Sequence, residues 1–287
     1  MALPTFFIIG AAKAGTTSLH CYLDQHPDIQ MSTVKEPNFF SDDKSGIPYP
    51  PGRVSSLGDY ERLFDADVSA RGEASVAYAS YPRRQGAPER IKELIPEAKF
   101  IYLVRDPIER TVSHYQHGVA YGGETRSLRE TLGDLSDPYS VCICPSLYAY
   151  QLERYLDHFS HERILVVDQV ELLTDRRTTL RRIFAFLSVE ESFESRQFDE
   201  ELNTSREHRM YPAGYQGMRE LTVAAPLRRL PPRLRRSLRR VAERMLWSPV
   251  ESSSLDGDLR SKLEELYVDD TERLRALTGK AFPTWSI

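Results

Sequence analysis

The stretch TFFIIGAAKAGTTSL, residues 5–19, runs an apolar strand into a turn of small residues and then into the start of a helix. The glycines and alanines of the turn allow successive backbone N–H groups to converge on one anion, and the positive end of the helix dipole faces the same point. Lysine and hydroxyl side chains add further donors. The stretch therefore predicts a phosphate-binding loop. Its expected contacts are Lys13, Ala14, Gly15, Thr16, Thr17 and Ser18.

The order of residues in this loop differs from that of nucleotide triphosphatases. Their loop reads Gly, four residues and then Gly-Lys-Ser/Thr, whereas here Thr16 takes the place of that lysine and Lys13 lies inside the loop. A triphosphatase uses its lysine together with Mg²⁺ on a bridging pair of phosphates. Lys13 is therefore expected to meet a different anionic group, and no metal site is predicted.

A second strand-to-helix crossing follows at residues 99–117, KFIYLVRDPIERTVSHYQH. The apolar run before Arg105 is short and bounded, which favours a buried strand. Asp106 and Pro107 are typical of a helix N-cap and of the first helical position. An arginine at the end of a strand and a serine on the next helix, Ser113, can hold one phosphate from two sides. The segment therefore predicts a second phosphate site.

The two crossings together resemble the sulfotransferases that use 3′-phosphoadenosine 5′-phosphosulfate (PAPS). Lys-x-Gly-Thr-Thr after a first strand resembles their 5′-phosphosulfate loop, and the segment from Arg105 to Ser113 resembles their 3′-phosphate site. The chain looks most like the heparan-sulfate-type (glucosaminyl) and related bacterial branch of the family. Residues 203–206, NTSR, resemble the family's late nucleotide-covering loop, and this implies that Arg206 contacts PAPS.

The resemblance also implies a catalytic base. In this branch the base is a glutamate before a Pro/Val-x-Phe-Phe run, and residues 35–40 read KEPNFF, so Glu36 is the matching carboxylate. His117, which follows Ser113 by one helical turn, is the reserve candidate.

The next family segment, Glu-Lys-Thr/Ser-x-x-Tyr, appears as EASVAY at residues 73–78. Ala74 stands where the family has a lysine. The role of that lysine is then vacant or is filled by another cation such as Lys35.

The activity that the resemblance implies is in-line sulfuryl transfer from PAPS to a hydroxyl or amine, with release of adenosine 3′,5′-bisphosphate. The acceptor is expected to be a small molecule, a glycan or a glycolipid. Lys13 would stabilise the leaving phosphate oxygen, and Glu36 would remove the acceptor proton. The scheme requires no metal.

The alternation of apolar runs and helical segments predicts an α/β fold, a P-loop-like domain whose central parallel sheet has helices on both faces. One sulfotransferase domain is expected over residues 1–287, with a nucleotide-binding core at about 1–190 and a C-terminal lid and helices at about 191–287. The expected strands lie near residues 5–10, 29–34, 70–73, 99–104 and 163–167, and the expected helices near 16–26, 86–95, 107–120, 146–159 and 176–187.

Composition sets wider bounds on function. The chain has 287 residues, 40% of them hydrophobic, which is enough for a sizeable core. A formal net charge of −4 gives no general attraction to nucleic acid, and no nucleic-acid partner is expected. Three cysteines are sparse and are expected to be reduced thiols. Because no apolar run resembles a signal peptide or reaches the roughly twenty residues of a membrane helix, a cytoplasmic enzyme is expected.

Two other functions stay open from the residues alone. A small-molecule kinase using ATP and Mg²⁺ has the same fold, and the strand ending in Asp168 imitates a magnesium-binding strand end. A catalytically silent nucleotide or lipid-surface binder is the second alternative. It would use residues 227–246, an arginine-rich amphipathic segment that suits a membrane or carrier-protein contact as well as ordinary packing.

Overall fold

The structure is a computed structural model that describes residues 2–43, 53–65, 67–120, 123–200, 209–210, 248–249 and 255–287. The predictions for Arg206 and for the basic segment 227–246 fall on residues outside these ranges.

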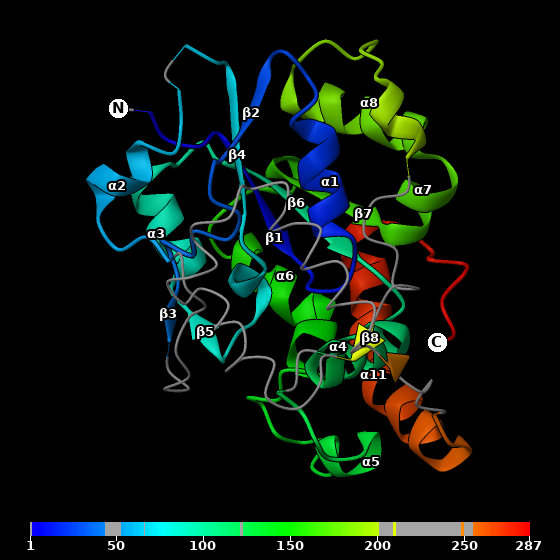
Figure 1. Cartoon of the computed structure of the whole chain (residues 1–287). Helices are drawn as coiled ribbons and strands as arrows, with labels where there is room; N and C mark the ends of the chain where they lie inside the picture. Colours follow the sequence, from blue (N-terminus) through cyan, green and yellow to red (C-terminus); the bar gives the residue numbers. More distant parts are fainter. Residues whose placement is uncertain are drawn as a thin grey trace, which may run out of the picture.

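A five-stranded parallel sheet forms the centre of the molecule (Figure 1). Its strand order is β2-β4-β1-β6-β7. The strands are β1 (Phe6–Gly10), β2 (Ile29–Met31), β4 (Ala70–Ala74), β6 (Lys99–Val104) and β7 (Ile164–Asp168). The chain leaves β1 toward β2 on one side, whereas β6 lies on the other side of β1. Ligands of such sheets bind outside the carboxyl ends of the strands at this reversal of order, so the β1–β6 boundary is the expected binding position.

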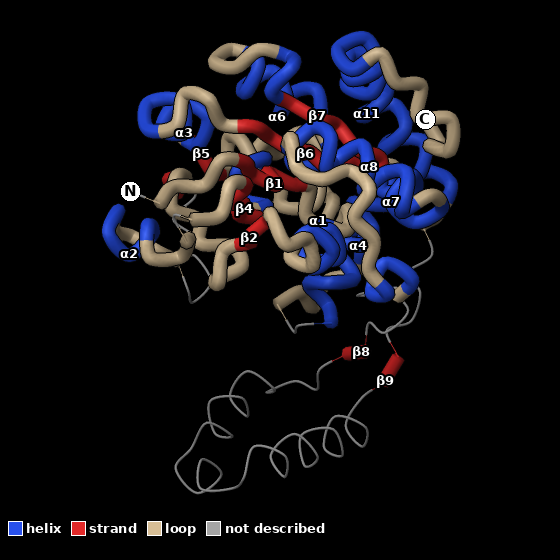
Figure 2. The backbone as a smooth tube through the Cα atoms, turned by 90° about the horizontal axis from the view of Figure 1, so that it is seen from above, coloured by secondary structure: helices blue, strands red, loops and turns tan. Residues whose placement is uncertain are grey.

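Helices cover both faces of the sheet (Figure 2). On one face lie α1 (Thr16–Leu23) and α8 (Arg176–Leu187), and on the other lie α3 (Ala87–Leu94) and α6 (Tyr148–Leu156). The remaining helices are α2 (Leu57–Glu61), α4 (Pro107–Ala120), α5 (Leu128–Thr131), α7 (Gln169–Thr174) and α11 (Gly257–Thr278). Two-residue strands β3 (Asp42–Asp43) and β5 (Arg84–Gln85) form one small sheet, and β8 (Arg209–Met210) and β9 (Ser248–Pro249) form another.

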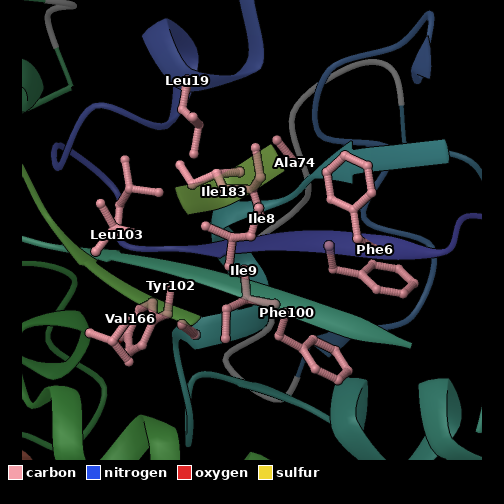
Figure 3. Packing of buried hydrophobic residues seen from close by; sticks show 14 of the residues in the cluster. Phe6, Ile8, Ile9, Leu19, Ala74, Phe100, Tyr102, Leu103, Val166 and Ile183 are labelled. Atoms are coloured by element: carbon pink, nitrogen blue, oxygen red, sulfur yellow. The ribbon is translucent and has the colours of Figure 1, made fainter. Parts of the chain in front are cut away.

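The core consists of two apolar layers, one on each face of the sheet. Neighbouring residues of a strand point to opposite faces, and Ile8 and Ile9 of β1 do so in Figure 3. Ile8 lies on the side of Leu19 from α1 and Ile183 from α8, whereas Ile9 lies on the side of Phe100. These five side chains are fully buried, so the sheet is fixed from both sides.

A glycine allows β4 to approach β1 closely. A Cβ atom placed on Gly72 would lie 2.1 Å from the ring of Phe6. Phe6 and Gly72 are register partners in the β1–β4 ladder. The large ring therefore occupies the space that a side chain at position 72 would need.

The predicted fold class is confirmed, and all five expected strands and five expected helices are present, with shifts at their ends. The strand expected at 29–34 ends at Met31. The helix expected from 146 begins at Tyr148, because a 3₁₀ turn, Cys144–Ser146, precedes it. A helix of 22 residues, α11, packs against α6 and α4, and the sequence predicted it only as part of the C-terminal helices. In the part of the chain that the structure describes, no helix is long and apolar enough to span a membrane.

Candidate active site

The predicted phosphate loop lies between β1 and α1 and is attached to β6. The backbone N–H of Ala11 donates to the carbonyl of Leu103 in β6 at 2.6 Å. Lys13 and Gly15 have φ values of +72° and +97°, in the left-handed region. Gly15 is the N-cap of α1 and has no side chain to bond the first helical N–H groups. Those donors and the positive end of the helix dipole are therefore available to a ligand anion.

Three cations gather beside this loop. Arg105 follows β6, and its Nη1 lies 3.4 Å from the Lys13 carbonyl oxygen. The side chain of Arg110 in α4 is fully buried, and its Nη1 lies 3.4 Å from the Ala12 carbonyl oxygen. Burial, and then the nearby charges of Arg105 and Arg110, lower the pKa of Lys13 to about 8. A bound anion would relieve this repulsion, because an opposite charge favours the protonated amine.

The helix after β6 faces the loop with Ser113 and His117. Lys13 Nζ lies 3.3 Å from His117 Nδ1, so the lysine spans from the loop to α4. Ser113 is 4% exposed, and its buried hydroxyl has no hydrogen-bond partner among the described residues. Buried polar groups almost always have partners. The vacant hydroxyl therefore fits the predicted contact with a phosphate.

The end of β6 that carries Arg105 is supported by α6 and the C-terminal residues. The Tyr148 hydroxyl donates to the carbonyl of Arg105 at 2.7 Å. Asp106 is the N-cap of α4 as predicted, since its Oδ1 accepts from the N–H groups of Ile108 and Glu109. Its Oδ2 accepts from the N–H of Ser286 at 2.6 Å. The chain end thus holds the turn that presents Arg105.

Asp168 at the end of β7 is engaged by protein donors on both carboxylate oxygens. Oδ1 accepts from the N–H of Val170 at 3.2 Å, and Oδ2 accepts from the indole N–H of Trp285 at 3.1 Å. The aspartate that imitates a magnesium ligand in the sequence is therefore a helix cap and an anchor for the C-terminal residues.

Glu36 lies at the carboxyl end of β4, which neighbours β1. Its N–H donates to the carbonyl of Ala74 at 3.0 Å. Its side chain is 32% exposed, and Oε1 lies 2.9 Å from Lys35 Nζ. Lys35 thus forms an ion pair with Glu36. Ala74, which stands at the position of the family lysine, is fully buried in the core.

The structure brings Lys13, Arg105, Ser113 and His117 together at the β1–β6 boundary. Thr16 is buried at the start of α1, and the next two residues are half-buried there. Glu36 lies one strand away, on the β4 side, and among the described residues no hydrogen bond or ion pair joins it to Lys13.

Two important residues were missed in the sequence. In the sequence Arg110 looks like an ordinary helix-surface arginine, although it follows Arg105 by five residues in the same motif. In the fold its guanidinium donates to Ser146 Oγ and to the Cys142 carbonyl, each at 2.7 Å. Glu73 was noted only as part of a family segment. It is fully buried, and burial raises its pKa to about 7, although hydroxyl donors of Tyr60, Ser75 and Tyr78 act in the opposite direction.

Comparisons with known proteins give the family of the chain. Residues 3–214 match the family of sulfotransferase domains. A bifunctional heparan sulfate N-deacetylase/N-sulfotransferase 4 of Mus musculus is 31% identical over 200 residues, 65% of this chain, and an N-deacetylase/N-sulfotransferase 2 of Bos taurus is 30% identical over 203 residues, also 65% of this chain. The chain spans 22% of the length of each of these relatives. A solved sulfotransferase from Alicyclobacillus acidocaldarius is 29% identical, with a TM-score of 0.73 over 100% of both chains.

The chain therefore belongs to the sulfotransferase family. The prediction of a PAPS-dependent sulfotransferase is confirmed for the family and the class of enzyme.

Proposed function

We propose that this protein transfers a sulfuryl group from PAPS to a hydroxyl or amine of an acceptor. The observation that carries the proposal is the pairing of two anion-binding crossings on adjacent parallel strands, β1 and β6. The β1 crossing supplies backbone N–H groups and Lys13, and the β6 crossing supplies Arg105 and the unpartnered hydroxyl of Ser113. Two such sites side by side suit a nucleotide with phosphates at its 5′ and 3′ positions.

The role of each residue follows from its place. Backbone N–H groups of Gly15 and Thr16, with the hydroxyls of the α1 start, would hold the 5′ end. Lys13 would donate to the phosphate oxygen that leaves sulfur, and Arg105 with Ser113 would hold the 3′-phosphate. Arg206 is proposed as a further contact on the strength of the family segment alone.

The reaction is an in-line displacement at sulfur. The acceptor oxygen or nitrogen forms a bond to sulfur while the bond from sulfur to the 5′-phosphate oxygen breaks. The acceptor proton goes to Glu36, and adenosine 3′,5′-bisphosphate leaves. Catalysis then rests on positioning and on fixed donors. His117 is the alternative base, and its 3.3 Å contact with Lys13 keeps it beside the transferred group.

The acceptor class that the relatives favour is a glycan. The names of the mouse and bovine relatives describe bifunctional N-deacetylases/N-sulfotransferases of heparan sulfate. An amine or hydroxyl of a glycan is therefore the first acceptor to test, followed by glycolipids and small hydroxylated molecules. We place the reaction in the cytoplasm.

A kinase is not favoured by the site. The lysine of the loop is at position 13 rather than 16, and the carboxylate of Asp168 is bonded to Val170 and Trp285. A silent binder is not favoured either, because Lys13 and Glu36 are both retained at the expected strand ends.

Calorimetry with three nucleotides tests the proposal. Adenosine 3′,5′-bisphosphate is expected to bind at least about tenfold more tightly than ATP with Mg²⁺ or adenosine 5′-monophosphate, since a charge-assisted phosphate contact is worth about 1.5–3 kcal/mol. The monophosphate is the matched control for the 3′ group. A preference for ATP with Mg²⁺ would contradict the proposal and support a kinase.

A further inference from the structure

The carboxylate of Glu73 is the centre of a buried group of three hydroxyls. Oε1 accepts from the hydroxyls of Tyr60 at 2.5 Å and Tyr78 at 2.9 Å, and Oε2 accepts from the hydroxyl of Ser75 at 2.7 Å. The four side chains come from β4, from the 3₁₀ turn that follows it and from α2. Three donors converge on a group that accepts without donating when it is ionised.

Two of the three hydroxyls also hold the backbone of the segment after Glu36. The Ser75 hydroxyl accepts from the N–H of Asn38 at 3.1 Å, and the Tyr78 hydroxyl accepts from the N–H of Phe40 at 3.2 Å. The third hydroxyl, that of Tyr60, donates to Glu73, and the Tyr60 ring stacks on Phe39 with the ring centroids 4.4 Å apart.

The direction of these bonds depends on Glu73. A hydroxyl has one proton, and if it is donated to the carboxylate, the oxygen lone pairs are left to accept. When it is ionised, Glu73 therefore turns the hydroxyls of Ser75 and Tyr78 so that their lone pairs meet the two backbone N–H groups. A rotated hydroxyl would point its proton at those N–H groups instead.

The segment that these bonds hold has an unusual backbone. Glu36 and Asn38 have φ values of +62° and +52°, in a region of backbone conformation that residues other than glycine rarely adopt. Such conformations persist where the surroundings determine them. The Asn38 amide adds a bond to the carbonyl of Glu36 at 2.7 Å. Glu36 itself is fixed by its N–H bond to Ala74, the residue next to Glu73.

We propose that Glu73 is a positioning residue that holds residues 36–40, and with them the carboxylate of Glu36, through the hydroxyls of Ser75 and Tyr78. The proposal rests on the proposed function for the role of Glu36. The bonding itself does not depend on that role, and so it can be tested without turnover.

Amide hydrogen exchange of the whole chain at pH 8, where Glu73 is ionised, is the direct test, read on peptides that cover residues 36–41. Ser75→Ala and Tyr78→Phe remove one acceptor each, and exchange in this segment is expected to rise about fivefold or more. Tyr60→Phe is the matched control, because it removes a bond of the same kind to Glu73 and leaves both backbone N–H bonds in place. Its exchange is expected to stay within twofold of the unaltered protein.

Glu73→Gln tests the carboxylate that accepts the three hydroxyl bonds. The amide keeps the size of the side chain but presents N–H donors toward one hydroxyl, so exchange at residues 36–41 is expected to rise at least as much as in Ser75→Ala. If this variant does not fold, Ser75→Ala, Tyr78→Phe and Tyr60→Phe still test whether the hydroxyls hold residues 36–40. Unchanged exchange in Ser75→Ala and Tyr78→Phe, or an equal rise in Tyr60→Phe, would overturn the proposal even in an active enzyme.

Turnover separates positioning from general stability. With PAPS as donor and de-N-sulfated heparin as the acceptor probe, Ser75→Ala and Tyr78→Phe are expected to lower kcat about tenfold and leave KM for PAPS within twofold. Tyr60→Phe should keep kcat near the original value, even if its melting temperature falls as much as that of Tyr78→Phe. Equal losses of kcat in Tyr60→Phe and Tyr78→Phe would overturn the positioning role. A failure of sulfuryl transfer in the unaltered protein would count against the proposed function and would leave the exchange result standing.

Discussion

The carboxyl ends of β1 and β6 carry cations that lie close together, one of them, Arg105, paired with Glu109 at 3.2 Å, whereas the carboxyl end of β4 carries carboxylates that accept from hydroxyl and amine donors. On the first side Lys13 and Arg105 lie beside the buried Arg110, and the Ser113 hydroxyl has no partner among the described residues. On the second side Glu73 accepts three hydroxyl donors. We propose that the first side receives an anion and that the second side holds its own loop.

We therefore assign nucleotide binding to the first side of the site and positioning of residues 36–40 to the second side. Repulsion among the cations is a cost that a ligand can remove. The carboxylate network is complete without a ligand, so its effect on a reaction passes through the loop that it fixes. Changes on the first side should alter nucleotide affinity and the chemical step, and changes on the second side should alter the chemical step and stability.

The largest expected effect is on the cationic side. Lys13→Ala should lower kcat by a factor of about a hundred or more, because it removes a donor aimed at the leaving oxygen. The melting temperature should change little, because burial and the neighbouring arginines disfavour the charged form of Lys13, so that the side chain contributes little to the stability of the fold. Steady-state kinetics with PAPS checks the first point and thermal unfolding the second. Turnover close to the original value would remove Lys13 from the chemistry.

On the carboxylate side, Glu36→Gln should lower kcat by a similar factor of about a hundred and leave binding of adenosine 3′,5′-bisphosphate unchanged, as expected for loss of a general base. Lys35→Ala is the matched control, because it removes the ion-pair partner of Glu36 and keeps the carboxylate. If Glu36→Gln keeps its activity while His117→Ala loses it, the base is on α4 instead.

Stability should depend on pH through Glu73. Its pKa is raised from 4.5 to about 7 in the folded protein. The folded form therefore keeps its proton to higher pH than the unfolded chain, and stability falls as the pH rises from about 4.5 to about 7. Glu73→Gln cannot titrate at this position. Between pH 5 and pH 8 its free energy of unfolding should therefore lack the part of the fall that Glu73 causes, which is on the order of 3 kcal/mol. Identical pH profiles would contradict the buried carboxylate.

Nucleotide affinity should depend on pH through Lys13, in a higher window. Its pKa is lowered to about 8 in the free protein, and a bound anion would raise it again. Binding then takes up a proton above about pH 8, and affinity for adenosine 3′,5′-bisphosphate should fall by up to about tenfold per pH unit there. Lys13→Arg stays charged and should bind with nearly constant affinity between pH 7 and pH 9. Calorimetry at several pH values gives both curves.

The sequence predicted the first side of the site better than the second. Backbone cradles depend on small residues at fixed spacing next to an apolar strand, so the loop at residues 10–18 and the Arg105 turn were visible as local patterns. The hydrogen-bond network of Glu73 was not visible, because its three partners lie two to thirteen residues away, in α2 and in the turn after β4, and no spacing rule joins them. The same holds for Trp285 and Ser286, which reach Asp168 and Asp106 from the other end of the chain.

Strands and helices of the core were predicted for a related reason. Burial on both faces of a parallel sheet requires continuous apolar runs, and β1, β6 and β7 have them. The start of α6 was misplaced by two residues because a proline-containing segment forms a 3₁₀ turn before the helix begins.

The most direct test of the central claim is a cycle of four affinities at the β1–β6 boundary. Adenosine 3′,5′-bisphosphate and adenosine 5′-monophosphate are each titrated into the original protein and into Arg105→Ala. The account predicts that the substitution costs the bisphosphate about 2 kcal/mol, roughly thirtyfold in Kd, and leaves the monophosphate nearly unaffected. Equal losses for both nucleotides, or no loss for either, would contradict the assignment of the 3′-phosphate to Arg105.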